Sequence, residues 1–140
     1  AEGRILLMYV LDTNVISAVR RPDRAPQVAA WLSGKSEQDL FLSVITIGEI
    51  ERGIRQQEGR DPAFAHDLRI WLDRTILLFS DRLLPFDAED ARIWGRLSAE
   101  IGYTGADLMI AASALRHSAT VVTGNVSDFA PTGVMIENPF

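Results

Sequence analysis

The sequence predicts an α/β fold of three layers, in which a small, mainly parallel β-sheet lies between two layers of helices. Short apolar runs alternate with helical patterns along the 140 residues. Strands that are separated by helices pair in parallel, because the helix carries the chain back to the same end of the sheet. No repeat or linker interrupts this alternation, so we expect one domain over residues 8–140. We expect residues 1–7 to be a remnant of processing without a function.

Each predicted strand is a short apolar run between charged or turn-forming residues. The first run, "YVL", stops abruptly at Asp12, Thr13 and Asn14. The predicted strands are residues 9–11, 40–44, 82–86, 120–123 and 134–137.

Proline, glycine and acidic residues mark the predicted helices. Pro26 and Pro62 stand where a proline begins a helix, and Gly34 stands where a glycine ends one. Asp87 and Asp90 place negative charge in the first turn of another helix. The predicted helices run from 12 or 13 to about 20–26, over 26–34, over 46–58, from 62 to about 79, over 87–101 and over 105–117.

Composition excludes several classes of protein. The chain has no cysteine, so disulfides, thiolate nucleophiles and cysteine-based zinc sites are absent, and a reducing cytoplasm is the expected location. No apolar stretch is long enough to cross a bilayer, so we expect no membrane contact. A net charge of −5 argues against general adhesion to nucleic acid through a basic surface.

Polar side chains follow three of the predicted strands. Asp12 follows the first strand, Glu49 lies shortly after the second, and Asn125 and Asp128 follow "TVVTG". Asp107 joins them if the helix of "GAD" begins there. Ligands of open α/β sheets bind at the carboxyl ends of the strands. We therefore expect these residues to meet at one edge of the sheet.

Carboxylates that meet at one edge need a cation. Two of them about 5 Å apart repel each other by roughly 3 kcal/mol at an effective dielectric constant near 20. Oxygen ligands without histidine or cysteine favour Mg²⁺ or Mn²⁺ over zinc. Magnesium commonly shares its site with phosphate oxygens, so hydrolysis of phosphodiester bonds is the expected chemistry.

Each of these residues also has a purely structural explanation. Asp12 or Thr13 can cap the helix that follows, and Asp107 can complement a helix dipole. Glu49 can be a solvated acid of an amphipathic helix. Asn125 and Asp128 lie in "GNVSDFAP", where turn-forming side chains are expected. Only their joint placement favours a site.

Five sequence segments together resemble a PIN-domain ribonuclease of the VapC toxin type, especially its FitB-like branch. They are "MYVLDTNVIS", "LSVITIGEIERGI", "LLPFDAEDARIWGRL", "GADLMIAASALRHSATVVTGNVSDF" and the closing "ENPF", and the resemblance covers residues 8–140. It implies a PIN-like fold and Mg²⁺- or Mn²⁺-dependent endoribonuclease activity. It also implies a toxin that a co-encoded VapB-like antitoxin neutralises, and we expect a homodimer.

The resemblance assigns roles to individual residues. Asp12, Glu49 and Asp107 match the three acidic positions of the family, and Asn125 matches a fourth that is often Asp. Asp128 remains the alternative fourth metal ligand. A second departure is Gly124, where an arginine is common.

Neighbouring residues have expected supporting roles. We expect Thr13, Asn14 and Thr123 to orient the acids, with Thr13 or Asn14 capping the first helix. Arg52 and Arg55 share the helix of Glu49 and are candidate contacts for RNA or antitoxin, although solvated surface explains both.

Other classes of protein fit less well. A phosphoacceptor receiver domain needs a lysine after a late strand, and the only lysine is Lys35. A haloacid-dehalogenase-like phosphatase needs an aspartate where Asn14 stands. A non-catalytic PIN-like module that binds RNA or protein is the alternative that requires an assay.

Overall fold

A single parallel sheet forms the centre of the computed structural model, which describes residues 7–140. Within these residues the strand order is β3-β2-β1-β4-β5, and every neighbouring pair is parallel. The predicted sheet and its strands are therefore confirmed, whereas residues 1–6 of the expected processing remnant lie outside the described residues. The strands are β1 (Tyr9–Leu11), β2 (Leu40–Ser43), β3 (Leu83–Leu84), β4 (Thr120–Val122) and β5 (Met135–Glu137).

The strand order reverses at β1. The first strand, β1, lies at the centre of the sheet; β2 and β3 follow on one side of it, and β4 and β5 on the other. Leu11 pairs with Val122, and the Asp12 N–H donates to the Val122 carbonyl at 3.0 Å. The residues that follow β1 and β4 are therefore neighbours at the carboxyl edge, where such sheets bind ligands.

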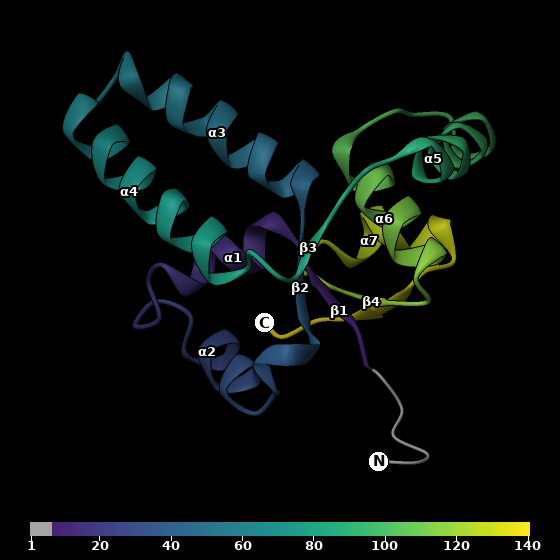
Figure 1. The fold of residues 1–140 in the computed structure, drawn as a ribbon, viewed down its shortest axis with the longest axis horizontal. Coiled ribbons are helices and arrows are strands. Elements are labelled where there is room, and N and C mark those ends of the chain that lie inside the picture. Colours follow the sequence, from purple (N-terminus) through teal and green to yellow (C-terminus); the bar gives the residue numbers. More distant parts are fainter. Residues whose placement is uncertain (1–6) are drawn as a thin grey trace.

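Helices cover both faces of the sheet (Figure 1). The structure confirms the predicted helices and adds a short one, α7, together with the 3₁₀ turns Glu37–Asp39 and Ala130–Thr132. The α-helices are α1 (Thr13–Val19), α2 (Pro26–Ser33), α3 (Val44–Glu58), α4 (Pro62–Leu78), α5 (Ala88–Ile101), α6 (Ala106–Arg116) and α7 (Val126–Phe129).

The buried side chains form two clusters, one on each face of the sheet. Adjacent residues of β1 belong to different clusters: Leu11 packs with residues of α1 to α4, and Val10 packs with residues of α6 and with Phe129. This division follows from the alternation of side chains along a strand. It confirms the three layers.

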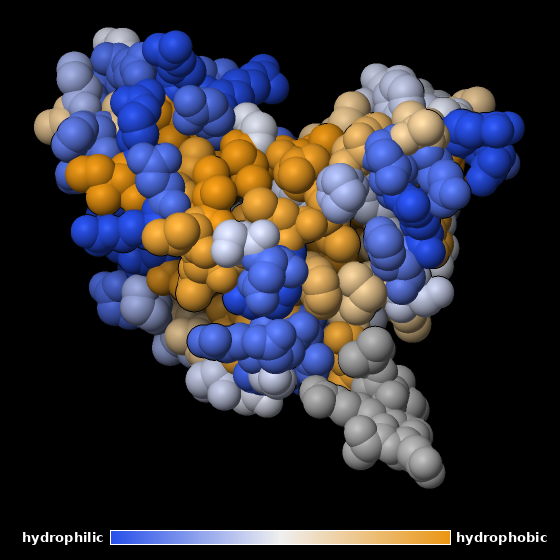
Figure 2. All heavy atoms as spheres, in the orientation of Figure 1, coloured by the Kyte–Doolittle hydropathy of each residue, from blue (hydrophilic) through white to orange (hydrophobic). Residues whose placement is uncertain are grey.

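Two lobes rise from the sheet on either side of a notch. The α3–α4 hairpin forms one lobe and α5 with α6 forms the other (Figure 1). Apolar side chains line the notch between the lobes (Figure 2). No helix of residues 7–140 is long and apolar enough to cross a membrane.

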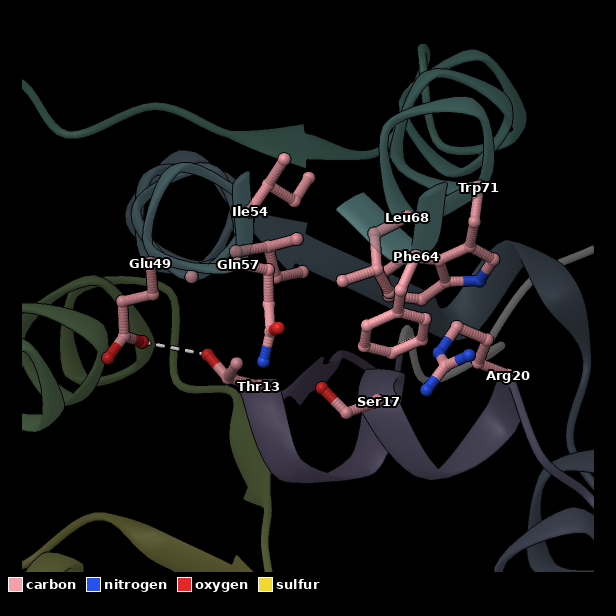
Figure 3. Close-up of a pocket in the computed structure, with 11 residues that line it drawn as sticks. Thr13, Ser17, Arg20, Glu49, Ile54, Gln57, Phe64, Leu68 and Trp71 are labelled. Atoms are coloured by element: carbon pink, nitrogen blue, oxygen red, sulfur yellow. Dashed lines mark hydrogen bonds between the residues drawn. The ribbon is translucent and has the colours of Figure 1, made fainter. Parts of the chain in front are cut away.

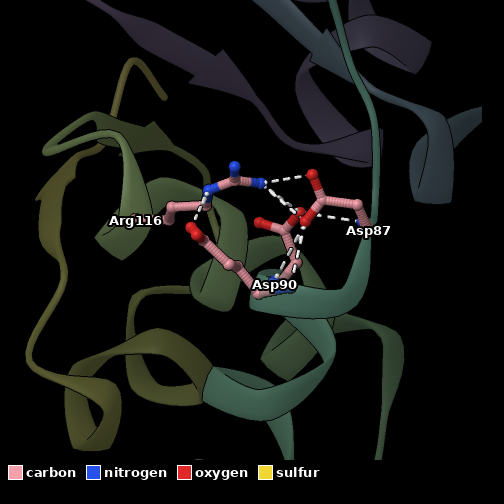
Figure 4. Close-up of polar contacts among 4 residues, drawn as sticks. Asp87, Asp90 and Arg116 are labelled. Atoms are coloured by element: carbon pink, nitrogen blue, oxygen red, sulfur yellow. Dashed lines mark hydrogen bonds and ion pairs between the residues drawn. The ribbon is translucent and has the colours of Figure 1, made fainter.

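An ionic contact ties α5 to α6 on the second lobe (Figure 4). Asp87 and Asp90 lie at the N-terminus of α5 as predicted, and they form a cap in which each side chain accepts a backbone N–H of the other residue. Arg116, the last residue of α6, donates to Asp87 at 2.6 Å and to the fully buried Asp90 at 3.1 Å. The two helices are thereby fixed against each other.

Candidate active site

Asp12 lies at the carboxyl end of β1 and is 2% exposed. Its Oδ1 accepts the backbone N–H of Thr13 at 2.8 Å, so Asp12 itself caps α1. The expectation that Thr13 or Asn14 supplies this cap is wrong, because the acid adopts the extended backbone of a cap residue while Thr13 is already helical.

The second oxygen of Asp12 is held by two side chains. Thr123 Oγ1 donates to Asp12 Oδ2 at 2.8 Å, and Asn14 Nδ2 donates to the same oxygen at 3.2 Å. Thr123 is fully buried at the end of β4. The carboxylate of Asp12 therefore has one fixed orientation at the point where the strand order reverses.

Glu49 reaches the same edge from α3. Thr13 Oγ1 donates to Glu49 Oε1 at 2.7 Å, although the two residues are far apart in sequence. Glu49 is half-buried and faces α1. It is therefore not one of the solvated acids of an amphipathic helix.

Asp107 lies in the first turn of α6 and is half-buried. Burial and the negative charges of Asp12, Asp128 and Glu49 raise the pKa of Asp107 to about 6. A helix N-terminus on its own lowers the pKa of a nearby carboxyl. Burial and repulsion thus outweigh the helix dipole at this residue.

Asp128 of α7 is the fourth carboxylate of this group. Its charge raises the pKa of Asp107, and it also raises the pKa of Asp12, for which burial is the larger cause. We call Asp12, Glu49, Asp107 and Asp128 the acidic edge.

Asn125 does not take part in the acidic edge through its side chain. It is exposed at the start of α7, and its backbone N–H donates to Thr123 Oγ1 at 2.9 Å. Among the described residues its side chain makes no hydrogen bond with the four acids. Asn125 and Asp128 are both exposed, and of the two only Asp128 adds negative charge near Asp12 and Asp107.

The donor set fits Mg²⁺ or Mn²⁺. All four side chains offer hard oxygen ligands and no nitrogen or sulfur. Within residues 7–140, no three acidic or histidine side chains are grouped closely enough to hold one ion together. One ion can therefore contact only one or two of these carboxylates directly. Mg²⁺ commonly binds proteins in this way, because it keeps several of its waters.

The loop after β4 explains the glycine at position 124. The Gly124 N–H donates to Asn14 Oδ1 at 3.2 Å, and a Cβ at this position would lie 2.9 Å from the ring of Phe140. Phe140 thus covers the backbone at Gly124, and a side chain at this position would displace its ring. Sequence reasoning gave no role to Phe140.

A pocket of about 310 Å³ opens beside the acidic edge, between α1, α3 and α4 (Figure 3). Thr13 and Glu49 line it, whereas Arg52 and Arg55 do not: both are exposed, and Arg55 pairs with Glu58 at 3.1 Å. Sequence reasoning missed Ser17, Arg20, Gln57 and Phe64 as further lining residues. Helical spacing offers a signal for two of them, because Ser17 lies four residues after Thr13 and Arg20 lies seven after it.

Comparisons with known proteins place this geometry in context. The family model described as "PIN domain" matches residues 9–130. "Toxin FitB" of Neisseria gonorrhoeae is 36% identical over an alignment of 140 positions, which covers 95% of this chain and 99% of the relative. "Ribonuclease VapC14" of Mycobacterium tuberculosis is 40% identical over 99 residues, which is 70% of this chain and 92% of the relative.

Solved structures agree with these matches. The crystal structure of FitAcB from Neisseria gonorrhoeae is 35% identical, with a TM-score of 0.82 over 94% of this chain and 98% of that one. A DNA-bound VapBC from Salmonella typhimurium has a TM-score of 0.77 over 96% of this chain and 99% of that one, at 23% identity, and so supports the fold alone.

Proposed function

Because this chain belongs to the PIN-domain family, we propose that it is a metal-dependent endoribonuclease and the toxin of a toxin–antitoxin pair. The similar proteins named as a toxin and as a ribonuclease support this proposal. The observation that carries it is the acidic edge, where Asp107 stays partly buried among three further carboxylates. Repulsion between these carboxylates destabilises the fold unless a cation offsets it, so their grouping favours a bound cation.

The chain's own residues define the site for a divalent ion. We assign Asp12, Asp107, Glu49 and Asp128 as the carboxylates that hold Mg²⁺ or Mn²⁺, one or two of them as direct ligands and the others through waters of the ion. When bound, the ion supplies an activated water and stabilises the charge that develops on the scissile phosphate. Thr123 and Asn14 orient Asp12, and Thr13 orients Glu49. Thr13 donates to Oε1 of Glu49, which leaves Oε2 for the ion or for one of its waters.

Asn125 keeps a smaller role in this proposal. Its amide is exposed beside Thr123 and carries no charge, so it suits a hydrogen bond to a phosphate oxygen better than a metal ligand. Replacing Asn125 by Ala should therefore weaken cleavage less than replacing Asp12 by Ala.

Sequencing of RNA ends tests the function directly. RNA from cells that briefly express the wild type should carry new ends that are absent after expression of Asp12→Ala. Identical end profiles, with both proteins folded and equally abundant, would leave the non-catalytic PIN-like module that binds RNA or protein as the better explanation.

The proposed partner is a VapB-like antitoxin. We propose that a segment of it covers the acidic edge and places a basic side chain among Asp12, Glu49 and Asp107. A positive charge there offsets the repulsion that the metal ion offsets, so the partner inhibits by displacing the ion. An inhibited complex that keeps its full metal content would show that occlusion, and not displacement, is the mechanism.

We also propose that the protein is a homodimer. The apolar notch between the lobes is the surface that such a contact would bury (Figure 2). Light scattering of the purified chain should give twice the monomer mass of 15.5 kDa, and a monomer at all concentrations would contradict this prediction.

A further inference from the structure

The pocket between α1, α3 and α4 carries groups that the proposed function does not use. Its inner wall is the hydrogen-bonded pair of Thr13 and Glu49, so the pocket and the acidic edge share a side chain (Figure 3). Its outer wall holds Arg20 and Phe64. Any ligand that occupies the pocket therefore lies directly beside a carboxylate of the site.

Arg20 is the cation of this pocket. Its guanidinium carbon lies 5.1 Å from the centroid of the Phe64 ring, so stacking holds the side chain in place. The ion pairs formed within residues 7–140 do not include Arg20. In a chain with a net charge of −5, a half-buried arginine without a carboxylate partner is suited to bind an anion from outside.

Neutral polar groups and an apolar wall complete the pocket. Ser17 of α1 and Gln57 of α3 point into the same space (Figure 3), and neither side chain is hydrogen-bonded within the described part of the chain. Gln57 offers both a donor and an acceptor, as the edge of a nucleobase requires. The apolar wall, against which the flat face of a base can pack, consists of Ile50, Ile54, Leu68 and Trp71.

We propose that this pocket binds the nucleotide next to the scissile phosphate of a single-stranded RNA, an inference that rests on the proposed function. Arg20 contacts the phosphate of that nucleotide, the apolar wall receives its base, and Gln57 reads the edge of the base. The shared wall of Thr13 and Glu49 favours RNA over a protein segment, because an RNA bound at the acidic edge has its adjacent nucleotide at the mouth of the pocket. One cation with a neutral amide and a hydroxyl also matches one phosphate and one base.

The salt dependence of RNA binding tests the role of Arg20. Affinity for a single-stranded RNA oligonucleotide is measured in Mg²⁺ over a series of salt concentrations, in an Asp107→Asn background that prevents cleavage. Each phosphate contact of a single strand contributes about 0.7 to the slope of log affinity against log salt. Arg20→Gln should lower the slope by about 0.7, and Arg20→Lys should restore it.

Arg60→Gln is the matched control, because Arg60 is exposed and does not line the pocket. Its slope should equal that of the background. Equal slopes for Arg20→Gln and the background, or equal losses for Arg20→Gln and Arg60→Gln, would overturn the proposal.

The sequence preference of cleavage tests Gln57. The Gln57→Leu variant, with no other substitution, should produce RNA ends with an altered base preference at a single position beside the cut. Gln56→Leu is the control, since Gln56 is exposed and lies outside the pocket. An unchanged preference in Gln57→Leu, or the same change in both variants, would overturn the assignment.

The outcomes separate this inference from the proposed function. A wild type that neither binds nor cleaves RNA contradicts both. A wild type that cleaves RNA, with Arg20 and Gln57 variants that fold normally and behave like their controls, contradicts only the pocket assignment. Variants that lose affinity for the antitoxin but keep full RNA binding and base preference show that the pocket is a protein contact.

Discussion

Asp107 is the residue at which the demands of function and stability conflict most directly. Its pKa is raised to about 6, by burial first and then by the charges of Asp12, Asp128 and Glu49. The ordinary value of 3.8 applies in the unfolded chain. Between these two values the folded protein holds a proton that the unfolded chain has lost.

This difference predicts how stability depends on pH without metal. Since the folded state binds more protons in that window, the free energy of unfolding should fall as pH rises from about 4 to about 6. Partial solvent exposure limits the contribution of Asp107 to about 1 kcal/mol. Urea unfolding in chelator at several pH values measures how the free energy of unfolding changes with pH. Asp107→Asn should remove the part of this change that comes from Asp107. An equal slope in both proteins would contradict the role of Asp107.

Metal binding should reverse the effect of the same substitution. In chelator at pH 7, Asp107→Asn should be more stable than the wild type by about 1 kcal/mol, because it relieves repulsion. Added Mg²⁺ should stabilise the wild type more than the variant, because stabilisation grows with affinity for the folded state. If Asp107 only complements the helix dipole, the variant should instead lose a few tenths to about 1 kcal/mol in both conditions.

Sequence reasoning at the residue scale predicted the placement of a residue where position along a strand was sufficient. Asp12 and Glu49 were identifiable because each follows a strand and because strand ends meet at one edge. The positions of Asn125 and Asp128 depend on α7, a single helical turn that the turn-rich segment "GNVSDFAP" did not reveal. Arg20 was missed because its importance comes from packing on Phe64, a residue of another helix.

At the scale of elements, α6 connects the site to an ionic contact at its other end. Asp107 lies in its first turn, and Arg116 closes it against Asp87 and Asp90 of α5. The hydrogen bond from Arg116 lowers the pKa of Asp87 to about 2. The packing of α6 on α5 thus depends on charges far from the acidic edge.

This contact predicts a second dependence on pH. Arg116→Gln should lower stability at neutral pH, since it leaves the buried carboxyl of Asp90 without its cation. Because the pKa of Asp87 is lower in the folded protein than in the unfolded chain, its ionised form stabilises the fold at pH values above 3.8. This stabilisation is lost as the pH falls from 3.8 toward 2. In urea unfolding, the difference in free energy of unfolding between the wild type and Arg116→Gln should therefore become smaller from pH 5 to pH 2. Arg92→Gln, an exposed change on α5, should show little effect, and a constant gap for Arg116→Gln would contradict the ionic explanation.

Element boundaries show what local sequence can and cannot determine. Pro26, Pro62 and the pair Asp87 and Asp90 marked helix starts correctly, because these signals act within one turn. Helix α3 begins at Val44, two residues earlier than predicted, because Ser43 Oγ accepts the N–H of Ile45 at 3.1 Å. From the sequence alone, a serine at the end of an apolar run is read as part of the strand, because its hydrogen bond to the helix is known only from the structure.

At the scale of the whole molecule, the strand order creates the site. The alternation of strands and helices predicted a parallel sheet but not the order β3-β2-β1-β4-β5. The strand order depends on the face of the sheet over which each connecting helix passes. Packing between residues that are distant in sequence determines that face. The strand order places the ends of β1 and β4 side by side and so brings Thr123 to Asp12.

The central claim is that the acidic edge hydrolyses RNA with a divalent ion and water, and the chemistry of the RNA ends tests it most directly. Purified protein is incubated with RNA in Mg²⁺ and in excess chelator, and the new termini are identified. We predict 5′-phosphate and 3′-hydroxyl ends in Mg²⁺, because water attacks the phosphate in place of the 2′-hydroxyl, and no cleavage in chelator. Cyclic-phosphate ends, or full activity in chelator, would contradict the claim.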